Sequence, residues 1–189
     1  MGHSMFKNKN DIERYLRYAQ EYDQGYTPVS ASSDEPIYVP VPQEPKTVIV
    51  MRGLPGSGKS TFVEENFPNA VVCSADKFFI DNDGNYNFDV KRLSEAHQWC
   101  MEEFIDALFD KKREVVVDNT NMCNWEYANY ELLAENLGYK VRIIVMAAGL
   151  HDDTSTKTLA KRNTHGVDAT TIARMMDRYQ SGLDDEIVY

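Results

Sequence analysis

A nine-residue stretch at positions 53–61, Gly-Leu-Pro-Gly-Ser-Gly-Lys-Ser-Thr, constrains this chain more than any other part of its sequence. Its spacing fits the pattern G-x-x-x-x-G-K-[ST] of loops that bind phosphate groups. The apolar, β-branched run at 47–51 is typical of a buried strand, and the residues after Gly58 can begin a helix that ends near residue 66, before Pro68. A glycine-rich turn that binds nothing is the alternative, but a full match between a strand and a helix favours nucleotide binding.

The residue types of this loop suit a bound anion. Glycines let the backbone approach a phosphate without a Cβ clash, and successive N–H groups point into a concave nest at a helix N-terminus. We expect Lys59 to reach the β- and γ-phosphates of ATP and the Ser60 hydroxyl to hold Mg²⁺. The expected nucleotide-binding residues are Gly53, Pro55, Gly56, Ser57, Gly58, Lys59, Ser60 and Thr61.

Length and composition set broad bounds. The chain has 189 residues, enough for one domain of ordinary size, and its net charge of −10 argues against extended, non-specific contact with nucleic acid. Its apolar runs are short and its N-terminus is polar, so we expect neither a membrane span nor a signal peptide. Cys73, Cys100 and Cys123 lack metal-ligand spacing and cannot all pair, which predicts reduced thiols in an intracellular, cytoplasmic protein.

The N-terminal part, 1–46, differs in composition from the rest. It begins with four residues that resemble a purification-tag remnant and are left out of the fold reasoning. Positions 10–22 can form a short helix, whereas positions 24–46 hold five of the seven prolines and predict an extended arm that can bind a protein partner. Within the arm, 37–39 could add an edge strand to the domain. We expect 47–189 to form the folded domain.

From residue 47 onward, apolar β-branched runs alternate with helix-like segments. Strands are predicted at 47–51, 70–74, 114–118 and 141–146, and helices at 59–66, 89–110, 124–137, 153–163 and 168–181. The tail at 184–189 could add a short fifth strand. This alternation predicts an α/β fold with three layers, in which helices cover both faces of a four- to five-stranded, mainly parallel sheet.

Two segments within this pattern need an interpretation of their own. Asp and Asn gather at 81–88, but the closing Glu of a calcium-binding loop is absent, so a polar, turn-rich loop is predicted there. The helix at 89–110 is expected to bury one stripe of side chains, including His97. The members of that stripe are Val90, Leu93, His97, Cys100, Phe104 and Leu108.

Parallel strands place ligands beyond their C-terminal ends, where polar residues follow two of the predicted strands. Asp76 is the candidate for a general base that takes a proton from a hydroxyl, and the alternative is that it caps a short helix at 77–79. Asp118 ends a run of three valines, as expected of a carboxylate that contacts Mg²⁺. Asn119 and Asn121 could orient Asp118, bind acceptor hydroxyls, or serve as turn residues.

Four segments in this order resemble the P-loop kinase superfamily: the loop at 53–61, Cys-Ser-Ala-Asp at 73–76, Val-Asp-Asn-Thr-Asn at 117–121 and Arg-Asn-x-His-Gly at 162–166. The similarity is greatest to the polynucleotide 5′-hydroxyl kinases and to the ATP-binding proteins described as predicted kinases, and it spans about residues 47–180. It implies a P-loop NTPase fold with a helical lid at about 154–170.

The resemblance also implies roles for single residues. Asp76 falls at the general-base position, and Arg162 falls on the lid arginine that stabilises the transferred phosphoryl group. The planar guanidinium of Arg162 suits phosphate better than the ammonium group of Lys161. The related kinases typically carry an arginine three residues after the base, where this chain has Phe79. Phe78 and Phe79 could stack a nucleobase there, or pack in the core.

These observations predict an ATP- and Mg²⁺-dependent kinase that transfers the γ-phosphoryl group to a hydroxyl, with a polynucleotide or nucleotide as the expected acceptor. Asp76, Lys59 and Arg162 are the predicted catalytic residues. A kinase of a small metabolite, antibiotic or sugar nucleotide is an alternative that suits the acidic chain, and a kinase of a base hydroxyl within DNA is a variant. A third alternative is a nucleotide-binding module that recruits a partner through its N-terminal arm, which an intact Asp76 and Arg162 disfavour.

Overall fold

The computed structural model describes residues 26–29, 37–40 and 45–189. The chain divides into two compact units, Met1–Pro45 and Lys46–Tyr189. In the first unit β1 (Tyr26–Val29) and β2 (Ile37–Pro40) pair as an antiparallel ladder. The strand expected at 37–39 therefore exists, but its hydrogen-bonded partner is β1 and not a strand of the domain. The helix expected at 10–22 lies outside the described residues.

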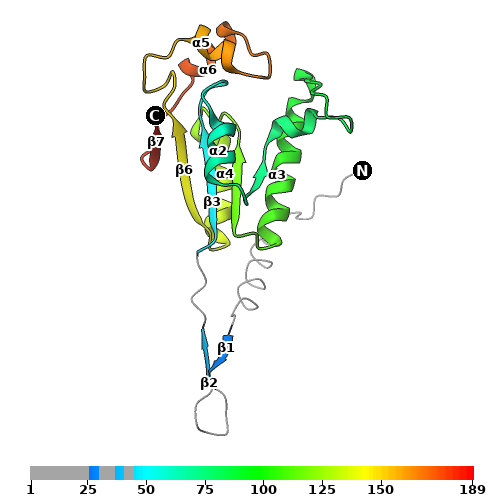
Figure 1. Cartoon of the computed structure of the whole chain (residues 1–189), viewed down its shortest axis with the longest axis vertical. Helices are drawn as coiled ribbons and strands as arrows, with labels where there is room; N and C mark the ends of the chain where they lie inside the picture. The colour runs from blue at the N-terminus through cyan, green and yellow to red at the C-terminus, as the bar shows by residue number, and fades with distance from the viewer. Residues whose placement is uncertain (1–25, 30–36, 41–44) are drawn as a thin grey trace. The chain divides into compact units, whose positions relative to one another are not determined.

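The second unit is built on a sheet of five strands that all run parallel, in the order β4-β5-β3-β6-β7 (Figure 1). The strands are β4 (Val71–Cys73), β5 (Glu114–Asp118), β3 (Thr47–Arg52), β6 (Lys140–Met146) and β7 (Asp185–Val188). The predicted α/β fold with a four- to five-stranded, mainly parallel sheet is confirmed. The C-terminal tail supplies the fifth strand, which pairs with the end of β6.

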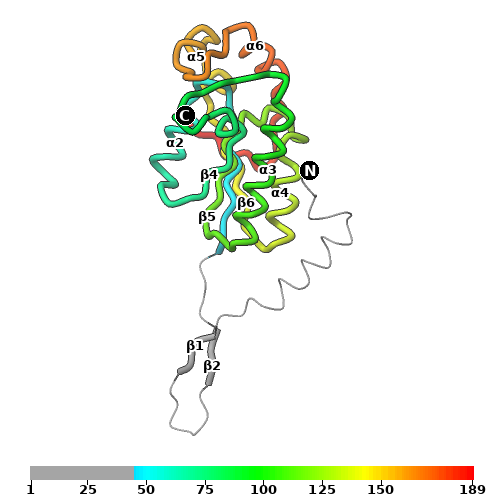
Figure 2. The backbone as a smooth tube through the Cα atoms, turned by 90° about the vertical axis from the view of Figure 1, so that its right-hand side faces the viewer, coloured from blue at the N-terminus to red at the C-terminus, as the bar shows by residue number. Residues whose placement is uncertain are grey.

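Side chains of the central strand β3 alternate between two cores, because successive residues of a strand point to opposite faces. Val48 and Val50 join the cluster beneath α3 (Leu93–Phe109) and α4 (Asn124–Asn136). Ile49 and Met51 join the cluster beneath α2 (Lys59–Asn66). Figures 1 and 2 show α2 on one side of the sheet and α3 and α4 on the other, which gives three layers.

Two short helices, α5 (Thr156–Arg162) and α6 (Ala169–Asp177), lie beyond the C-terminal ends of the strands (Figure 1). Ser155 caps α5, which therefore begins three residues later than predicted: its Oγ accepts from the Thr158 amide. Asp168 caps α6, with Oδ1 accepting from two amides, and α6 ends at Asp177, four residues before the predicted end. Both helices pack on a separate apolar cluster. Its fully buried members are Leu54, Met122, Leu159 and Ile172.

The predicted helix at 89–110 begins differently from expectation. Asp89 caps a 3₁₀ turn, η2 (Val90–Arg92), and α3 starts only at Leu93, so residues before it do not share the helical periodicity. The buried stripe is Ala96, Cys100, Phe104, Ala107 and Leu108. Val90 is 68 % exposed, and His97 is exposed as well. The expectation that His97 packs in the core is therefore wrong.

The three cysteines are buried and form no disulfide. Burial raises the pKa of the Cys73 thiol to about 12, so this thiol stays protonated. Among the described residues, every helix is too short or too polar to cross a lipid bilayer.

Candidate active site

The phosphate-binding pattern forms the turn between β3 and α2. Gly56 and Gly58 take positive φ values of 76° and 99°, which favour glycine, and Gly58 stands at the N-terminal cap of α2 without a capping side chain. The first amides of α2 are thus available to an anion in the turn. Gly53 does not line the cavity described below, and a Cβ on it would come within 2.8 Å of Ser57 Oγ.

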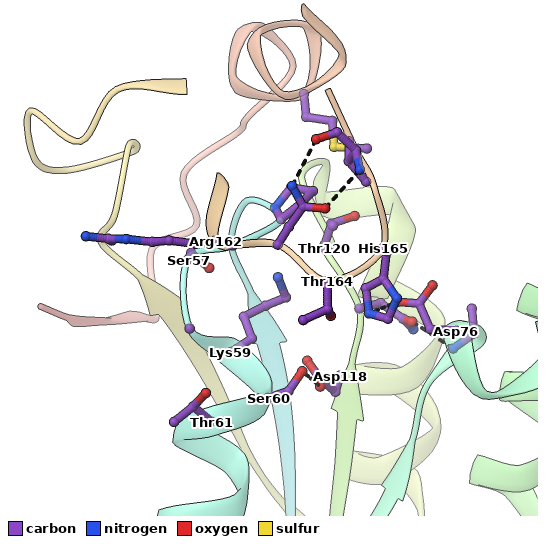
Figure 3. Close-up of a pocket in the computed structure, with 18 of the residues that line it drawn as sticks. Ser57, Lys59, Ser60, Thr61, Asp76, Asp118, Thr120, Arg162, Thr164 and His165 are labelled. Carbon is purple, nitrogen blue, oxygen red and sulfur yellow. Dashed lines mark hydrogen bonds and ion pairs between the residues drawn. The ribbon is translucent and has the colours of Figure 1, made fainter. Parts of the chain in front are cut away.

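A cavity of about 690 Å³ opens over this turn. Figure 3 shows Lys59, Ser60 and Asp118 at its centre and Asp76 with His165 to one side. The lining residues around these include 55–61, Asp76, Tyr86, Phe88, Leu93, His97, Asp118, Asn119, Thr120 and 162–165. The cavity therefore brings together residues of the turn after β3, of the ends of β4 and β5, and of the α5–α6 region.

Lys59 and Asp118 both line the cavity. Lys59 Nζ donates to the carbonyl oxygens of Gly53 and Leu54 at 3.0 and 3.1 Å. Burial lowers the pKa of Lys59, and the nearby carboxylates of Asp118 and Asp76 act in the opposite direction. A buried cation held only by two neutral carbonyl groups is well placed to pair with an anion that enters the turn.

Two buried oxygens of the turn region, Ser57 Oγ and Asp118 Oδ1, have no hydrogen-bond partner among the described residues. Buried polar atoms are normally paired, so these two point to a missing ligand. Ser60 Oγ donates to the other carboxylate oxygen, Asp118 Oδ2, at 2.8 Å. Hydroxyl and carboxylate oxygens suit Mg²⁺, which usually binds one or two protein oxygens together with phosphate. The residues present thus fit the predicted Mg²⁺ and nucleotide.

Asp76 lies on η1 (Ala75–Phe79), the 3₁₀ turn that follows β4. The capping position of that turn belongs to Ser74, so the helix-capping alternative for Asp76 is wrong. Its Oδ1 accepts from the Tyr86 hydroxyl at 2.9 Å, and its Oδ2 lies 3.7 Å from His165 Nε2. The Asp76 side chain is 49 % exposed, and it lines the cavity. One carboxylate oxygen is thereby fixed while the group stays accessible.

Tyr86 and His165 are the site residues that sequence reasoning missed. Their rings lie 4.6 Å apart between centroids, so each supports the other beside Asp76. His165 is presented by a loop that Asn163 braces, because Asn163 Nδ2 donates to the Ala160 carbonyl and its Oδ1 accepts from the amide at position 167. The Arg-Asn-x-His-Gly segment was a signal for His165. Nothing in the loop at 81–88 pointed to Tyr86.

The three residues predicted to contact substrate, Asn119, Asn121 and Phe78, differ in their positions relative to the cavity. Asn119 lines the cavity, but its Oδ1 accepts from the Ala75 amide at 3.0 Å and so holds η1 in place. Asn121 is buried with φ 47°, and its Nδ2 donates to the Met51 carbonyl at 2.8 Å. Asn121 is therefore a turn residue that does not reach the cavity, in agreement with the turn-residue alternative.

Phe78 also lies away from the cavity. The Arg92 guanidinium lies 4.5 Å from the centre of the Phe78 ring, and the centroid of the Trp99 ring lies 6.3 Å from that of Phe78. Phe78 was expected to contact substrate, but the 3₁₀ turn directs Phe78 and Phe79 toward the core beneath α3. Tyr86 and Phe88 are the aromatic residues that line the cavity.

Arg162 is the last residue of α5 and lines the cavity, whereas Lys161 does not. In Figure 3 the Arg162 side chain extends away from Lys59 and Asp76. The helix that carries it packs directly on the turn: a Cβ on Gly56 would lie 2.3 Å from the Leu159 carbonyl oxygen. The structure thus brings Arg162 to the cavity rim, with its guanidinium outside the centre.

Comparison with known proteins places the chain in a family. The AAA_33 model, described as an AAA domain, matches residues 48–181. Human NEDD4-binding protein 2 is 39 % identical over 148 residues, which are 75 % of this chain and 8 % of that protein. The chain therefore spans less than a tenth of this curated relative.

Two solved structures share the fold. A chain of the Pnkp1/Rnl/Hen1 RNA repair complex has a TM-score of 0.54 at 17 % identity, over 79 % of this chain and 46 % of that one. The Mycobacterium tuberculosis APS kinase CysC, in complex with AMPPNP and APS, has a TM-score of 0.50 at 16 % identity, over 77 % of this chain and 90 % of that one. The family match covers more than half of the sequence, so the chain belongs to the AAA_33 family of AAA domains and has the fold of the P-loop kinase superfamily.

Proposed function

We propose that this chain is an ATP-dependent phosphotransferase that moves the γ-phosphoryl group to a hydroxyl of a polynucleotide or nucleotide. One observation carries the proposal: the accessible carboxylate of Asp76 opens into the same cavity as the phosphate-binding turn. A carboxylate beside a phosphate cradle is the arrangement that transfer to a hydroxyl requires. The resemblance of the segments around Asp76 and Asp118 to the 5′-hydroxyl kinases supports a nucleic-acid acceptor.

In the proposed reaction Asp76 accepts the proton of the acceptor hydroxyl. The acceptor oxygen forms its bond to the γ-phosphorus as the bond from that phosphorus to the β-phosphate oxygen breaks, and ADP leaves. Lys59 offsets negative charge on the phosphoryl group, and Arg162 does so from the lid once its side chain turns inward. Ser60 and Asp118 would hold Mg²⁺, which supplies further charge neutralisation on the phosphates.

A small-molecule kinase is the second candidate. Among the described residues that line the cavity, Lys59 and Arg162 are the only lysine or arginine side chains, and both belong to the phosphate turn or the lid. The Asp76 side of the cavity therefore offers no lysine or arginine to a phosphate-bearing acceptor. Together with the net charge of −10, this favours a neutral acceptor of modest size over a long nucleic-acid track.

The deciding experiment measures transfer from γ-labelled ATP with Mg²⁺ to 5′-hydroxyl DNA and RNA oligonucleotides, nucleosides and small alcohols. Asp76→Asn is the test variant. Asp83→Asn is the matched control, because Asp83 is exposed in the adjoining loop and does not line the cavity. We expect transfer to an oligonucleotide end that falls about a hundredfold or more in Asp76→Asn and is unchanged in Asp83→Asn.

The other outcomes reassign the function. Transfer only to nucleosides or small alcohols, still dependent on Asp76, establishes the small-molecule kinase. ATP binding without transfer to any hydroxyl rejects the enzyme and leaves the nucleotide-binding module that recruits a partner.

A further inference from the structure

The Asp76 side of the cavity carries an exposed apolar rim. The Phe88 side chain is 52 % exposed and Leu93 is 38 % exposed, whereas neighbouring Phe79 is 4 % exposed. Phe88 and Leu93 both line the cavity, together with His97. Large apolar side chains exposed inside a cavity are typical of contact with an apolar or planar part of a ligand.

The Phe88 ring is held in place by the protein itself. Its centroid lies 5.0 Å from the Phe79 ring in an edge-to-face contact, and 6.4 Å from the Tyr86 ring at an interplanar angle of 13°. The loop that carries it is braced by Asp81, whose Oδ1 accepts from the Asn85 amide at 2.8 Å. A ring fixed before a ligand arrives loses little conformational entropy when the ligand stacks on it.

The spacing from Asp76 suits a nucleoside. The Tyr86 hydroxyl contacts Asp76, and the Tyr86 ring lies nearly parallel to that of Phe88, so a single aromatic side chain links the carboxylate to Phe88. In a nucleoside, one sugar ring separates the 5′-hydroxyl from the base. A 5′-hydroxyl placed at Asp76 can therefore extend its base toward Phe88.

The charges around the rim favour stacking over phosphate pairing. His97 and His165 are the basic side chains on this side of the cavity among the described residues that line it. Phe79, at the position where the resembling kinases carry an arginine, is buried beneath the rim and supports Phe88. At the position where those kinases carry a cation, the chain thus has a buried aromatic ring that supports the exposed Phe88.

We propose that Phe88, flanked by Leu93 and His97, is a stacking platform for the base of the acceptor nucleoside at an unpaired 5′ end of a nucleic acid strand. The inference rests on the proposed function, because the base reaches the platform only when its hydroxyl lies at Asp76. We place the platform at an unpaired end, because a base in a single strand is free to turn one face onto an aromatic side chain.

The first test compares two single-stranded 5′-hydroxyl oligonucleotides that differ only in whether the terminal sugar carries a base. We expect kcat/KM to be about ten- to a hundredfold higher with the base, the range set by one stacking contact. In Phe88→Ala this ratio falls toward one. In the matched control Val90→Ala it is retained, because Val90 is also exposed, at 68 %, but lies outside the cavity. A ratio near one in the unaltered protein, or a full ratio in Phe88→Ala, overturns the platform whatever the transfer rate.

The second test does not depend on turnover. An oligonucleotide with 2-aminopurine as its 5′-terminal base should lose fluorescence on binding to the unaltered protein and to Val90→Ala, and should keep it with Phe88→Ala. Where no acceptor is phosphorylated but this Phe88-dependent quenching occurs, the proposed kinase function fails and the platform stands. Where neither transfer nor quenching occurs, both proposals fail.

Discussion

At the scale of single residues, the Tyr86 hydroxyl is the group that fixes the candidate base. It donates to Asp76 at 2.9 Å, and burial together with this hydrogen bond raises the pKa of Tyr86, so the hydroxyl stays a donor from neutral pH well into the alkaline range. In Tyr86→Phe we expect kcat to fall about tenfold or more, with the KM for ATP unchanged, because a hydrogen bond to a charged group is lost outside the nucleotide site.

The matched control for Tyr86→Phe is Tyr139→Phe. The Tyr139 hydroxyl is also buried and donates to backbone carbonyls, at 3.0 Å in the case of Lys112, but it lies far along the sheet from the cavity. Steady-state kinetics should show normal kcat in this control even if thermal unfolding shows a loss of stability. An equal fall of kcat in both variants would mean that Tyr86 acts through general packing.

We expect the charged Lys59 side chain to lower the stability of the folded chain while it serves phosphate binding. Burial lowers the pKa of Lys59 in the folded chain below its value in the unfolded chain, so the folded state binds this proton more weakly. The free energy of unfolding therefore increases as the pH rises from the pKa of Lys59 in the folded chain to its pKa in the unfolded chain. We expect Lys59→Met to abolish phosphoryl transfer and to unfold at an equal or higher urea concentration than the unaltered protein at pH 7. Its free energy of unfolding should also lack the increase with pH that Lys59 contributes. A clear loss of stability in Lys59→Met at pH 7 would contradict it.

At the scale of elements, the periodicity of apolar residues predicted the parallel sheet and the helices that cover it. The strand at 114–118 is found with those limits, because three valines before Asp118 can be buried only in a parallel strand. The start of α3 was not predictable from periodicity, because Asp89 caps a 3₁₀ turn there. Cys100, Phe104 and Leu108 are buried as predicted, whereas Leu93 and His97, nearer the start of α3, are exposed and line the cavity. Tyr86 was missed because only the folding of a polar loop brings it to Asp76.

The contact between α5 and the phosphate turn gives a prediction at this scale. Gly56 and Gly138 share a φ of 76°, but a Cβ on Gly56 would lie 2.3 Å from the Leu159 carbonyl, whereas a Cβ on Gly138 meets nothing within 4 Å. We expect Gly138→Ala to cost about 1–2 kcal/mol from backbone strain alone. Gly56→Ala should cost more and also weaken ATP binding, because α5 must move off the turn. Equal losses in calorimetric unfolding, with equal ATP affinity, would show that α5 does not rest on the turn.

At the scale of the whole second unit, one buried arginine joins segments far apart in the sequence. Arg52 is fully buried at the end of β3, and its Nη1 donates to both carboxylate oxygens of Asp185 of β7, at 2.8 and 2.9 Å. Its Nε donates to the Asn121 carbonyl after β5, and its guanidinium lies 5.1 Å from the Tyr179 ring that follows α6. The centre of the sheet, its edge strand β7 and the segment that follows α6 therefore contact the same side chain.

The consequence is a large and cooperative loss when this side chain is removed. Arg52→Met leaves the Asp185 carboxylate, 6 % exposed, without its partner, and we expect the unfolding free energy to fall by about 3–5 kcal/mol. Arg142→Met is the matched control, because Arg142 pairs with Glu186 between β6 and β7 but both side chains are more than a third exposed, which predicts a loss below about 1 kcal/mol. Adding Asp185→Leu to Arg52→Met should recover part of the loss, because it removes the unpaired charge. Urea unfolding, followed by far-UV circular dichroism and by tryptophan fluorescence, measures the loss in all three variants. If Arg52→Met costs no more than Arg142→Met, β7 and the segment after α6 are held by their apolar contacts and not through Arg52.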